Sequence, residues 1–226
     1  MVNFPITEEL AEVILTYGME VGQRRLLDGI VAPDFTPEAI RLLKRKKDKC
    51  RFLVNQALAG LTEASLDHNP RRRPVRGGYL KQDNYTFVLD FKDSQLVKYG
   101  ELGTEEQQDL VLAWAIGSTS NSNTITLVKN GQLIGNGVGQ QARHYAAALA
   151  KERAKTGQHE TRGAVAYSDS FLPFPDGAEI LVNLDIYGLL TSSGAVNDKL
   201  TIEACAKASV SLWMIPDTVG RGFFGH

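Results

Sequence analysis

The chain has 226 residues, and its 25 lysines and arginines against 26 acidic residues leave a formal charge of −1. This near-neutral charge argues against an overall field that would attract a nucleic acid or an anionic membrane. Hydrophobic residues make up 43% of the chain and charged residues 23%, which is typical of a globular protein. The longest uncharged stretch is rich in Ser, Thr and Asn, and no basic segment precedes an apolar run at the N-terminus. We therefore expect neither a membrane-spanning helix nor a secretory signal.

The cysteines and histidines indicate no metal centre. Cys50 and Cys205 lie far apart in the sequence, without a partner at metal-binding or redox spacing, which is typical of reduced thiols in a cytoplasmic protein. The histidines are also scattered, at positions 68, 144, 159 and 226, and no zinc-deaminase or metalloprotease motif occurs. We expect no bound metal.

The first half of the chain predicts short elements separated by irregular segments. Apolar spacing, caps and short apolar runs predict helices over residues 7–19, 37–46 and 104–115 and strands over residues 29–32, 51–57 and 79–91, the last with a turn near residues 82–84. Residues 62–78 hold four arginines and two prolines with little hydrophobic pattern, which predicts a long irregular connection.

Two runs of basic residues each allow two interpretations. Residues 44–47 close the second predicted helix, where cations complement the helix dipole, and this interpretation is favoured over a binding patch. Residues 71–73 are three consecutive arginines beside two prolines, which favours a solvated loop over a phosphate site.

The second half predicts a regular alternation of strands and helices. Predicted strands cover residues 124–128, 132–136, 163–167, 187–190 and 210–215, and predicted helices cover residues 140–155, 177–185 and 197–208. The first two strands flank Asn130-Gly131, the strongest short hairpin signal. This alternation predicts an α/β fold with a parallel or mixed sheet covered on both faces.

A glycine-rich segment, Gly135, Gly137 and Gly139, lies between a predicted strand and helix and has three interpretations. It is a poor match to a dinucleotide fingerprint with Asp169 as the ribose-binding acid, because the third glycine comes one place early and the strand belongs to a hairpin. Bare amides at a helix N-terminus with Arg143 in its first turn also suit a phosphate. Alternatively, the glycines let the helix pack closely on the sheet.

The loop of residues 168–176 places two carboxylates and two phenylalanines between a strand and a helix. Ligands of open α/β sheets bind at this kind of position, and aromatic side chains there can stack on a flat heterocycle. The alternative is that both phenylalanines fill the core beneath a proline-rich loop.

Five segments recur together at a spacing compatible with a known family: SN at 122–123, KNGQLIG at 129–135, GVGQQAR at 137–143, SDSFLPFPD at 168–176 and IEAC at 202–205. With a closing Arg, Phe and terminal His226, they resemble the transformylase domain of the bifunctional purine-biosynthesis family. That domain is an AICAR (aminoimidazole carboxamide ribonucleotide) formyltransferase, commonly fused to an IMP cyclohydrolase. The likeness is strongest over residues 121–215 and extends more weakly back to about residue 28.

The resemblance implies a cytidine-deaminase-like three-layer α/β/α fold with a mixed sheet and without the zinc. It implies a dimer whose active sites lie across the interface. It also implies a role in purine (IMP) biosynthesis, in which the co-substrate 10-formyltetrahydrofolate gives its formyl group to the amine of AICAR.

The resemblance further implies site residues. Positions that match the family's nucleotide contacts are Asn123, Arg143, Phe171, Arg221 and Asp28, with Arg143 beside the phosphate. Positions on the folate side are His144, Asp176, Ala195 and Val196, although the family more often has a serine in place of Ala195.

One family feature has no counterpart here. The family uses an adjacent Lys-His pair for proton transfer and oxyanion stabilisation, and no Lys-His dipeptide occurs in this chain. We therefore assign no catalytic residue and expect negligible turnover by the chain alone. Residues 1–118 are interpreted as a connecting segment and partial first lobe, and residues 119–226 as the C-terminal transformylase subdomain.

The partners that we expect are the AICAR nucleotide, the formyl-folate, and either a second copy of the chain or a subdomain bearing the Lys-His pair. Two alternatives stay open. The chain is a non-catalytic nucleotide-binding paralogue or subunit, or it is a Rossmann-type dinucleotide-binding protein.

Overall fold

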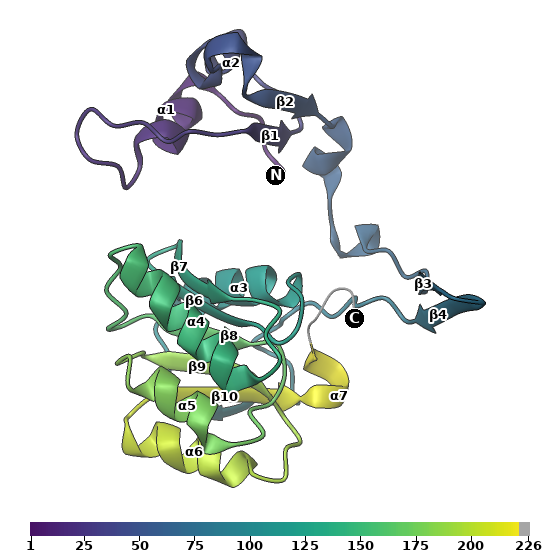
Figure 1. The fold of residues 1–226 in the computed structure, drawn as a ribbon, viewed down its shortest axis with the longest axis vertical. Helices are drawn as coiled ribbons and strands as arrows, with labels where there is room; N and C mark the ends of the chain where they lie inside the picture. The colour runs from purple at the N-terminus through teal and green to yellow at the C-terminus, as the bar shows by residue number, and fades with distance from the viewer. Residues whose placement is uncertain (222–226) are drawn as a thin grey trace. The chain divides into compact units, whose positions relative to one another are not determined.

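The computed structural model describes residues 1–221, which divide into two compact units, one of Met1–Asp67 and one from His68 onward (Figure 1). The division differs from the expected functional boundary between residues 118 and 119. Helix α3 (Thr104–Ser118), assigned to the first part, packs against strands β6 and β8 of the second unit. What each part does stays a prediction.

The first unit pairs two helices with a two-stranded parallel sheet. Its elements are α1 (Glu8–Thr16), β1 (Gly29–Ala32), α2 (Pro37–Leu43), β2 (Arg51–Val54) and the short 3-10 helices η1 (Lys46–Asp48), η2 (Gln56–Gly60) and η3 (Glu63–Ser65). The hydroxyl of Thr7 accepts from the Leu10 amide at 3.4 Å, and that of Thr36 accepts from the Ala39 amide at 3.2 Å. These are the N-caps of the two helices.

Helix α2 is shorter than predicted. It ends at Leu43, and Lys44 already has φ −61° and ψ 128°, outside the helical region. The basic run of residues 44–47 therefore begins at the C-cap and follows the last turn, so the predicted helix end at residue 46 was wrong.

Residues 62–78 were predicted to be irregular, but part of this segment forms regular structure. Strands β3 (Arg71–Val75) and β4 (Gly78–Gln82) form an antiparallel hairpin, with Gly77 at φ +84° in the turn. The Arg72 guanidinium lies 5.0 Å from the centre of the Tyr79 ring. The hairpin gives no apolar alternation because its side chains are almost all exposed, and the predicted strand over residues 79–91 ends at Gln82.

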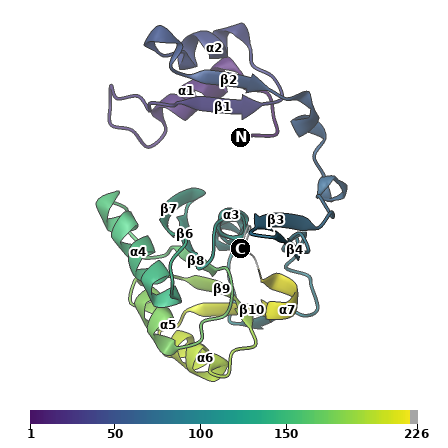
Figure 2. The ribbon, with the colours of Figure 1, turned by 45° about the vertical axis from the view of Figure 1, so that its right-hand side comes forward.

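The second unit contains a six-stranded mixed sheet in the order β5-β10-β9-β8-β6-β7 (Figure 2). Its strands are β5 (Val97–Tyr99), β6 (Ile125–Lys129), β7 (Gln132–Gly137), β8 (Val165–Ser168), β9 (Gly188–Ser193) and β10 (Ser211–Pro216). The strands β8, β9 and β10 are parallel, whereas β6 is antiparallel to β8, β7 to β6, and β5 to β10. The expected α/β class with a mixed sheet is confirmed.

Helices cover both faces of this sheet. Helices α4 (Arg143–Thr156), α5 (Pro175–Val182) and α6 (Asp198–Lys207) lie on one face, α3 lies on the other, and α7 (Asp217–Gly220) follows β10 (Figure 2). Neighbouring strand residues point to opposite faces. Leu127 and Leu189 thus join the apolar cluster under α4 and α5, and Val128 and Leu190 join the cluster under α3. This double burial explains the continuous apolar runs of the sequence.

The hairpin between β6 and β7 is confirmed. Asn130 and Gly131 have φ of 53° and 70°, the left-handed values that a tight hairpin turn requires. The carboxylate of Asp109, on α3, accepts both turn amides, from Asn130 at 2.7 Å and from Gly131 at 2.6 Å.

The glycine-rich segment is mostly strand. Gly135 and Gly137 belong to β7, and a Cβ at either position would overlap a backbone carbonyl of α4, that of Ala150 or that of Ala146. These two glycines therefore let α4 lie directly on the strand. Because β7 is antiparallel to β6 and α4 begins only at Arg143, the segment is not a dinucleotide fingerprint.

Across residues 1–221, every helix is too short or too polar to cross a bilayer.

Candidate functional site

One edge of the six-stranded sheet gathers the loops that carry most of the predicted site residues. The parallel strands β8, β9 and β10 end there, at Ser168, Ser193 and Pro216. Because β6 runs in the opposite direction, its first residue, Ile125, pairs with Ser168 and Gly137 at the same edge. Ligands of open α/β sheets bind at this edge, beyond the carboxyl ends of the parallel strands.

A cleft of about 440 Å³ opens at this edge. It is lined by Asn123, Gln141, Ala142, Arg143, His144, Pro173, Phe174 and Asp176. Four of the predicted site residues, two from the nucleotide side and two from the folate side, thus line one cleft.

Arg143 is the first residue of α4, and its side chain is 15% exposed. Its Nη2 lies 3.5 Å from Oδ1 of the fully buried Asp169, and its guanidinium lies 5.8 Å from the centre of the Phe171 ring. Its Nε is buried and has no hydrogen-bond partner among residues 1–221. Burial lowers the pKa of Arg143, and the nearby carboxylates of Asp169 and Asp217 oppose this effect.

Asn123, which lines the cleft, is hydrogen-bonded to the loop that precedes α4. Its side-chain amide donates to the Gln140 carbonyl at 2.8 Å, and the two residues also exchange backbone hydrogen bonds at 3.1 and 3.2 Å. The Gly139 amide donates to the Asn121 carbonyl at 2.9 Å. These bonds fix the approach to the N-terminus of α4.

His144 and Asp176 face each other from two helices. Nδ1 of His144 lies 3.3 Å from Oδ2 of Asp176, with the side chains 37% and 53% exposed. The other Asp176 oxygen accepts from the Gly177 amide at 2.7 Å. One imidazole and one carboxylate thus remain accessible to a ligand in the cleft.

The sequence left open whether Phe171 and Phe174 face a ligand or fill the core, and the structure places the two side chains differently. Phe171 is partly buried beside Arg143, whereas Phe174 is 61% exposed and lines the cleft. The sequence signal for Phe174 was its place in the same loop, but only Phe171 was named as a site residue.

Ala195 and Val196 do not line this cleft, and Val196 is fully exposed. Their loop is joined to the Phe171 loop through Asn197, whose side-chain amide donates to the Pro173 carbonyl at 2.9 Å. The two loops are therefore neighbours at the same edge of the sheet.

Asp217 connects the ends of three parallel strands, and sequence reasoning missed it. One of its oxygens accepts from the hydroxyls of Ser170 and Ser192, each at 2.5 Å, and the other accepts from Arg221 through Nε at 2.7 Å and through Nη2. Burial raises the pKa of Asp217, but the hydrogen bonds from Arg221, Ser170 and Ser192 outweigh it, so the pKa is lowered. This network holds the predicted site residue Arg221.

Two predicted features lie elsewhere. Asp28 belongs to the first unit, where its carboxylate pairs with Nη1 of Arg45 at 2.7 Å. The closing Phe and His226 lie outside the described residues.

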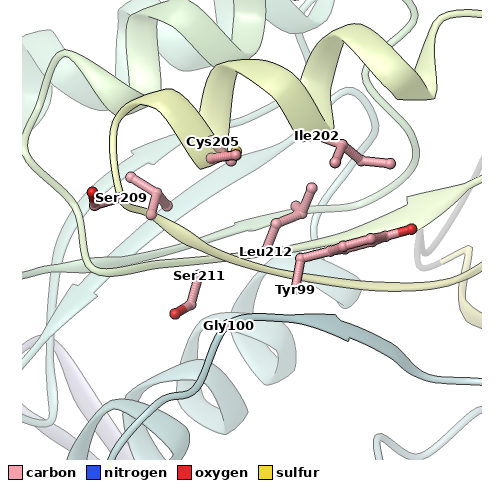
Figure 3. Close-up of a pocket in the computed structure, with 9 residues that line it drawn as sticks. Tyr99, Gly100, Ile202, Cys205, Ser209, Ser211 and Leu212 are labelled. Carbon is pink, nitrogen blue, oxygen red and sulfur yellow. The ribbon is translucent and has the colours of Figure 1, made fainter.

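A second cavity, of about 340 Å³, lies near the start of β10, with Cys205, Ile202, Leu212 and Tyr99 around it (Figure 3). None of the predicted site residues lines it. Burial raises the pKa of Cys205 to about 11, so its thiol is protonated at neutral pH. This cavity adds no chemistry to the candidate site.

Comparison with known proteins identifies a family that the chain matches. The chain matches the model of the AICARFT/IMPCHase bienzyme family over residues 1–153. The bifunctional purine biosynthesis protein PurH of Aquifex aeolicus (strain VF5) is 31% identical over 186 residues, which are 82% of this chain and 35% of that protein. The chain thus spans about a third of the relative's length. The family match begins at residue 1, further toward the N-terminus than the expected limit near residue 28, and it ends at residue 153, within the range of residues 121–215 over which the likeness was expected to be strongest.

Two solved structures of low sequence identity also match. The dCMP deaminase from the cyanophage S-TIM5 is 12% identical, with a TM-score of 0.39 over 51% of this chain and 100% of that chain. A diaminohydroxyphosphoribosylaminopyrimidine deaminase/5-amino-6-(5-phosphoribosylamino)uracil reductase from Thermotoga maritima is 16% identical, with a TM-score of 0.35 over 49% of this chain and 36% of that chain. Because both of these likenesses are weak, we assign the α/β class from the topology of the sheet.

Proposed function

This chain belongs to the AICARFT/IMPCHase bienzyme family, and from that membership we propose that its cleft takes part in formyl transfer to AICAR during purine (IMP) synthesis. The observation that carries the proposal is the meeting of Asn123, Arg143, His144 and Asp176 in one cleft. The first two match nucleotide contacts of the family, and the last two match folate-side positions.

On the nucleotide side, Arg143 supplies the phosphate contact. Its Nε donor is buried and unused within residues 1–221, and the N-terminus of α4 adds backbone amides and a favourable dipole for an anion. Arg221 supplies a second guanidinium that is held by Asp217 and half exposed. Phe171 lies against Arg143, so a nucleotide base or ring can pack beside the cation.

On the donor side, Asp176 and His144 address the folate. The accessible Asp176 carboxylate accepts hydrogen bonds from N–H groups of the donor heterocycle. Phe174 offers an exposed aromatic face on the same loop, and such a face stacks on a flat ring. His144, whose Nδ1 lies 3.3 Å from Oδ2 of Asp176, donates or accepts through its ring nitrogens.

The chemical step needs more than these contacts. The amine of AICAR attacks the formyl carbon, a base takes the amine proton, and donors stabilise the tetrahedral oxyanion. The bond between the formyl carbon and N10 of the folate then breaks, N10 takes a proton, and tetrahydrofolate leaves. The family's Lys-His pair has no counterpart in these 226 residues. We therefore propose that this chain binds and orients the reactants and that another subdomain, which bears the Lys-His pair, completes the site.

The test combines binding and turnover. We expect calorimetry to show that AICAR binds the purified chain, and we expect no formyl transfer from 10-formyltetrahydrofolate until a separately made Lys-His-bearing subdomain is added. Turnover by the chain alone would contradict the shared site, and absence of AICAR binding would contradict the whole proposal.

A second candidate function follows from the missing Lys-His pair. A non-catalytic nucleotide-binding protein would bind AICAR equally well but give no turnover with the added subdomain. The same experiment therefore separates the two functions.

A further inference from the structure

The first unit contains a basic groove that is lined by residues of two kinds, apolar and cationic. The groove has a volume of about 530 Å³, and all twelve residues that line it are leucines, lysines or arginines. They come from the end of α1, the segment before β1, and the end of α2 with the turn after it. The sequence pattern favoured a helix end for residues 44–47, and the structure shows that these residues also line the basic groove.

The floor of the basic groove is apolar and fixed. Leu15 and Leu43 are 6% and 2% exposed, as part of the core of the first unit. Arg25 is held against this floor, because its guanidinium donates to the carbonyls of Ile14 at 3.4 Å and Tyr17 at 3.0 Å. Ile14 lies in the last turn of α1, which has no basic residue of its own, and Tyr17 is the C-cap, so Arg25 caps that helix.

Part of the positive charge is compensated within the protein. Arg24 pairs with Glu12 at 3.4 Å, Lys44 with Asp48 at 2.9 Å, and Arg45 with Asp28 at 2.7 Å. Each pair includes an exposed carboxylate, so these pairs are weak and give way to a stronger anion.

Lys46, Lys47 and Lys49 remain without an acidic partner. No carboxylate within residues 1–221 forms an ion pair with any of the three, and Arg25 bonds only to backbone carbonyls. Four uncompensated cations around one hollow repel one another and raise the local concentration of anions.

We propose that the basic groove binds a small organic anion that carries two or more phosphate groups on an apolar or aromatic body. The lysines are compact charges that suit phosphate oxygens, and the leucine floor receives the apolar body. The volume falls within the roughly 300–1,000 Å³ that is usual for small-molecule sites. This site is independent of the proposed function, since none of its lining residues lines the cleft.

The test maps binding directly. The whole chain, labelled with ¹⁵N, is titrated with ADP and with inorganic pyrophosphate at fixed ionic strength, and amide shifts are followed. We expect the amides of residues 24–27 and 44–49 to shift, with a tighter dissociation constant for ADP than for pyrophosphate. Citrate, a control ligand that carries carboxylates in place of phosphate groups, is expected to bind more weakly than ADP or pyrophosphate.

Two double variants give the control. Lys46→Gln with Lys47→Gln is expected to weaken ADP binding about tenfold, whereas Lys92→Gln with Lys151→Gln, which removes two exposed lysines of the second unit, leaves it unchanged. Shifts confined to Asn123, Arg143 and the other cleft residues would overturn the basic groove and leave the proposed function standing. Equal weakening by both double variants, or citrate binding as tight as ADP binding, would also overturn the proposal.

Discussion

Nη2 of Arg143 lies 3.5 Å from Oδ1 of Asp169, a carboxylate with no exposed surface. The pair is buried at the N-terminus of α4, where burial lowers the pKa of Arg143 and Asp169 opposes that effect. A buried cation held by a buried anion is costly to leave incomplete. This pair is therefore a structural contact, and the buried Nε of Arg143, which has no hydrogen-bond partner within residues 1–221, is the donor on which the proposed phosphate contact depends.

We expect Arg143→Ala to weaken AICAR binding by about 1.5–3 kcal/mol, the range for hydrogen bonds to charged groups. Calorimetry measures the affinity, and Arg162→Ala is the control, because Arg162 makes only an exposed ion pair with Asp185 at 3.1 Å. Unchanged affinity in Arg143→Ala would remove the phosphate contact from the proposal.

Asp217 is predicted to make stability depend on pH in the acid range. Its folded pKa is lowered below its ordinary value of 3.8, so its contribution is fully present well above pH 3.8 and is lost as the pH falls through the folded pKa. Urea unfolding at several pH values should show a shallower acid loss in Asp217→Asn. The exposed Asp185→Asn is the control and should keep the slope of the parent chain.

The two sides of the cleft are predicted to be separable. We expect Asp176→Asn to weaken folate binding while sparing AICAR binding, because the proposal assigns Asp176 to the donor heterocycle and Arg143 to the phosphate. Calorimetry with each ligand in turn checks this division. Equal losses for both ligands would show that the His144–Asp176 contact shapes the whole cleft.

Strands β6 to β10 of the second unit could be predicted from the sequence because each of them is buried on one or both faces. Burial produces apolar runs, as in β6 and β9, and Asn130-Gly131 marks its own turn. Strand β5 is only three residues long and exposed, so it left no pattern. The arginine-rich β3 was missed for the same reason.

The Asp217 network could not be predicted, because its partners meet only through the order of the strands. Ser170 and Ser192 precede Asp217 by 47 and 25 residues, and they become neighbours because β8, β9 and β10 are adjacent and parallel. Nothing local in the sequence specifies that order. The cleft residues were found through the family resemblance rather than through periodicity.

Asp109 is predicted to stabilise the β6–β7 turn. Its side chain accepts the amides of Asn130 and Gly131 at 2.7 and 2.6 Å, and Asp109→Ala leaves both donors without this partner. We expect a loss of about 1.5–3 kcal/mol in the free energy of unfolding, measured by urea denaturation. Gln108→Ala, at an exposed position of the same helix, should change stability by less than about 0.5 kcal/mol.

The last prediction separates the packing role of the glycines from a ligand role. A Cβ at Gly137 would overlap the Ala146 carbonyl of α4, whereas a Cβ at Gly139 would meet only Asn121, at 4.0 Å. We expect Gly137→Ala to cost more than about 3 kcal/mol of unfolding free energy, since the whole helix must move away from the strand. Gly139→Ala should cost about 1–2 kcal/mol, because Gly139 has φ +69° and an L-residue is strained there.

Urea denaturation of both variants, with calorimetry of AICAR binding to each folded variant, measures this difference. If Gly137→Ala keeps the stability of the parent chain and loses only ligand binding, the packing role is wrong, and Gly137 instead provides close backbone approach to a ligand. A loss of stability in Gly137→Ala that exceeds the loss in Gly139→Ala supports the packing role. The larger loss then occurs at the position where an added Cβ overlaps α4, and the smaller loss where an added Cβ has room.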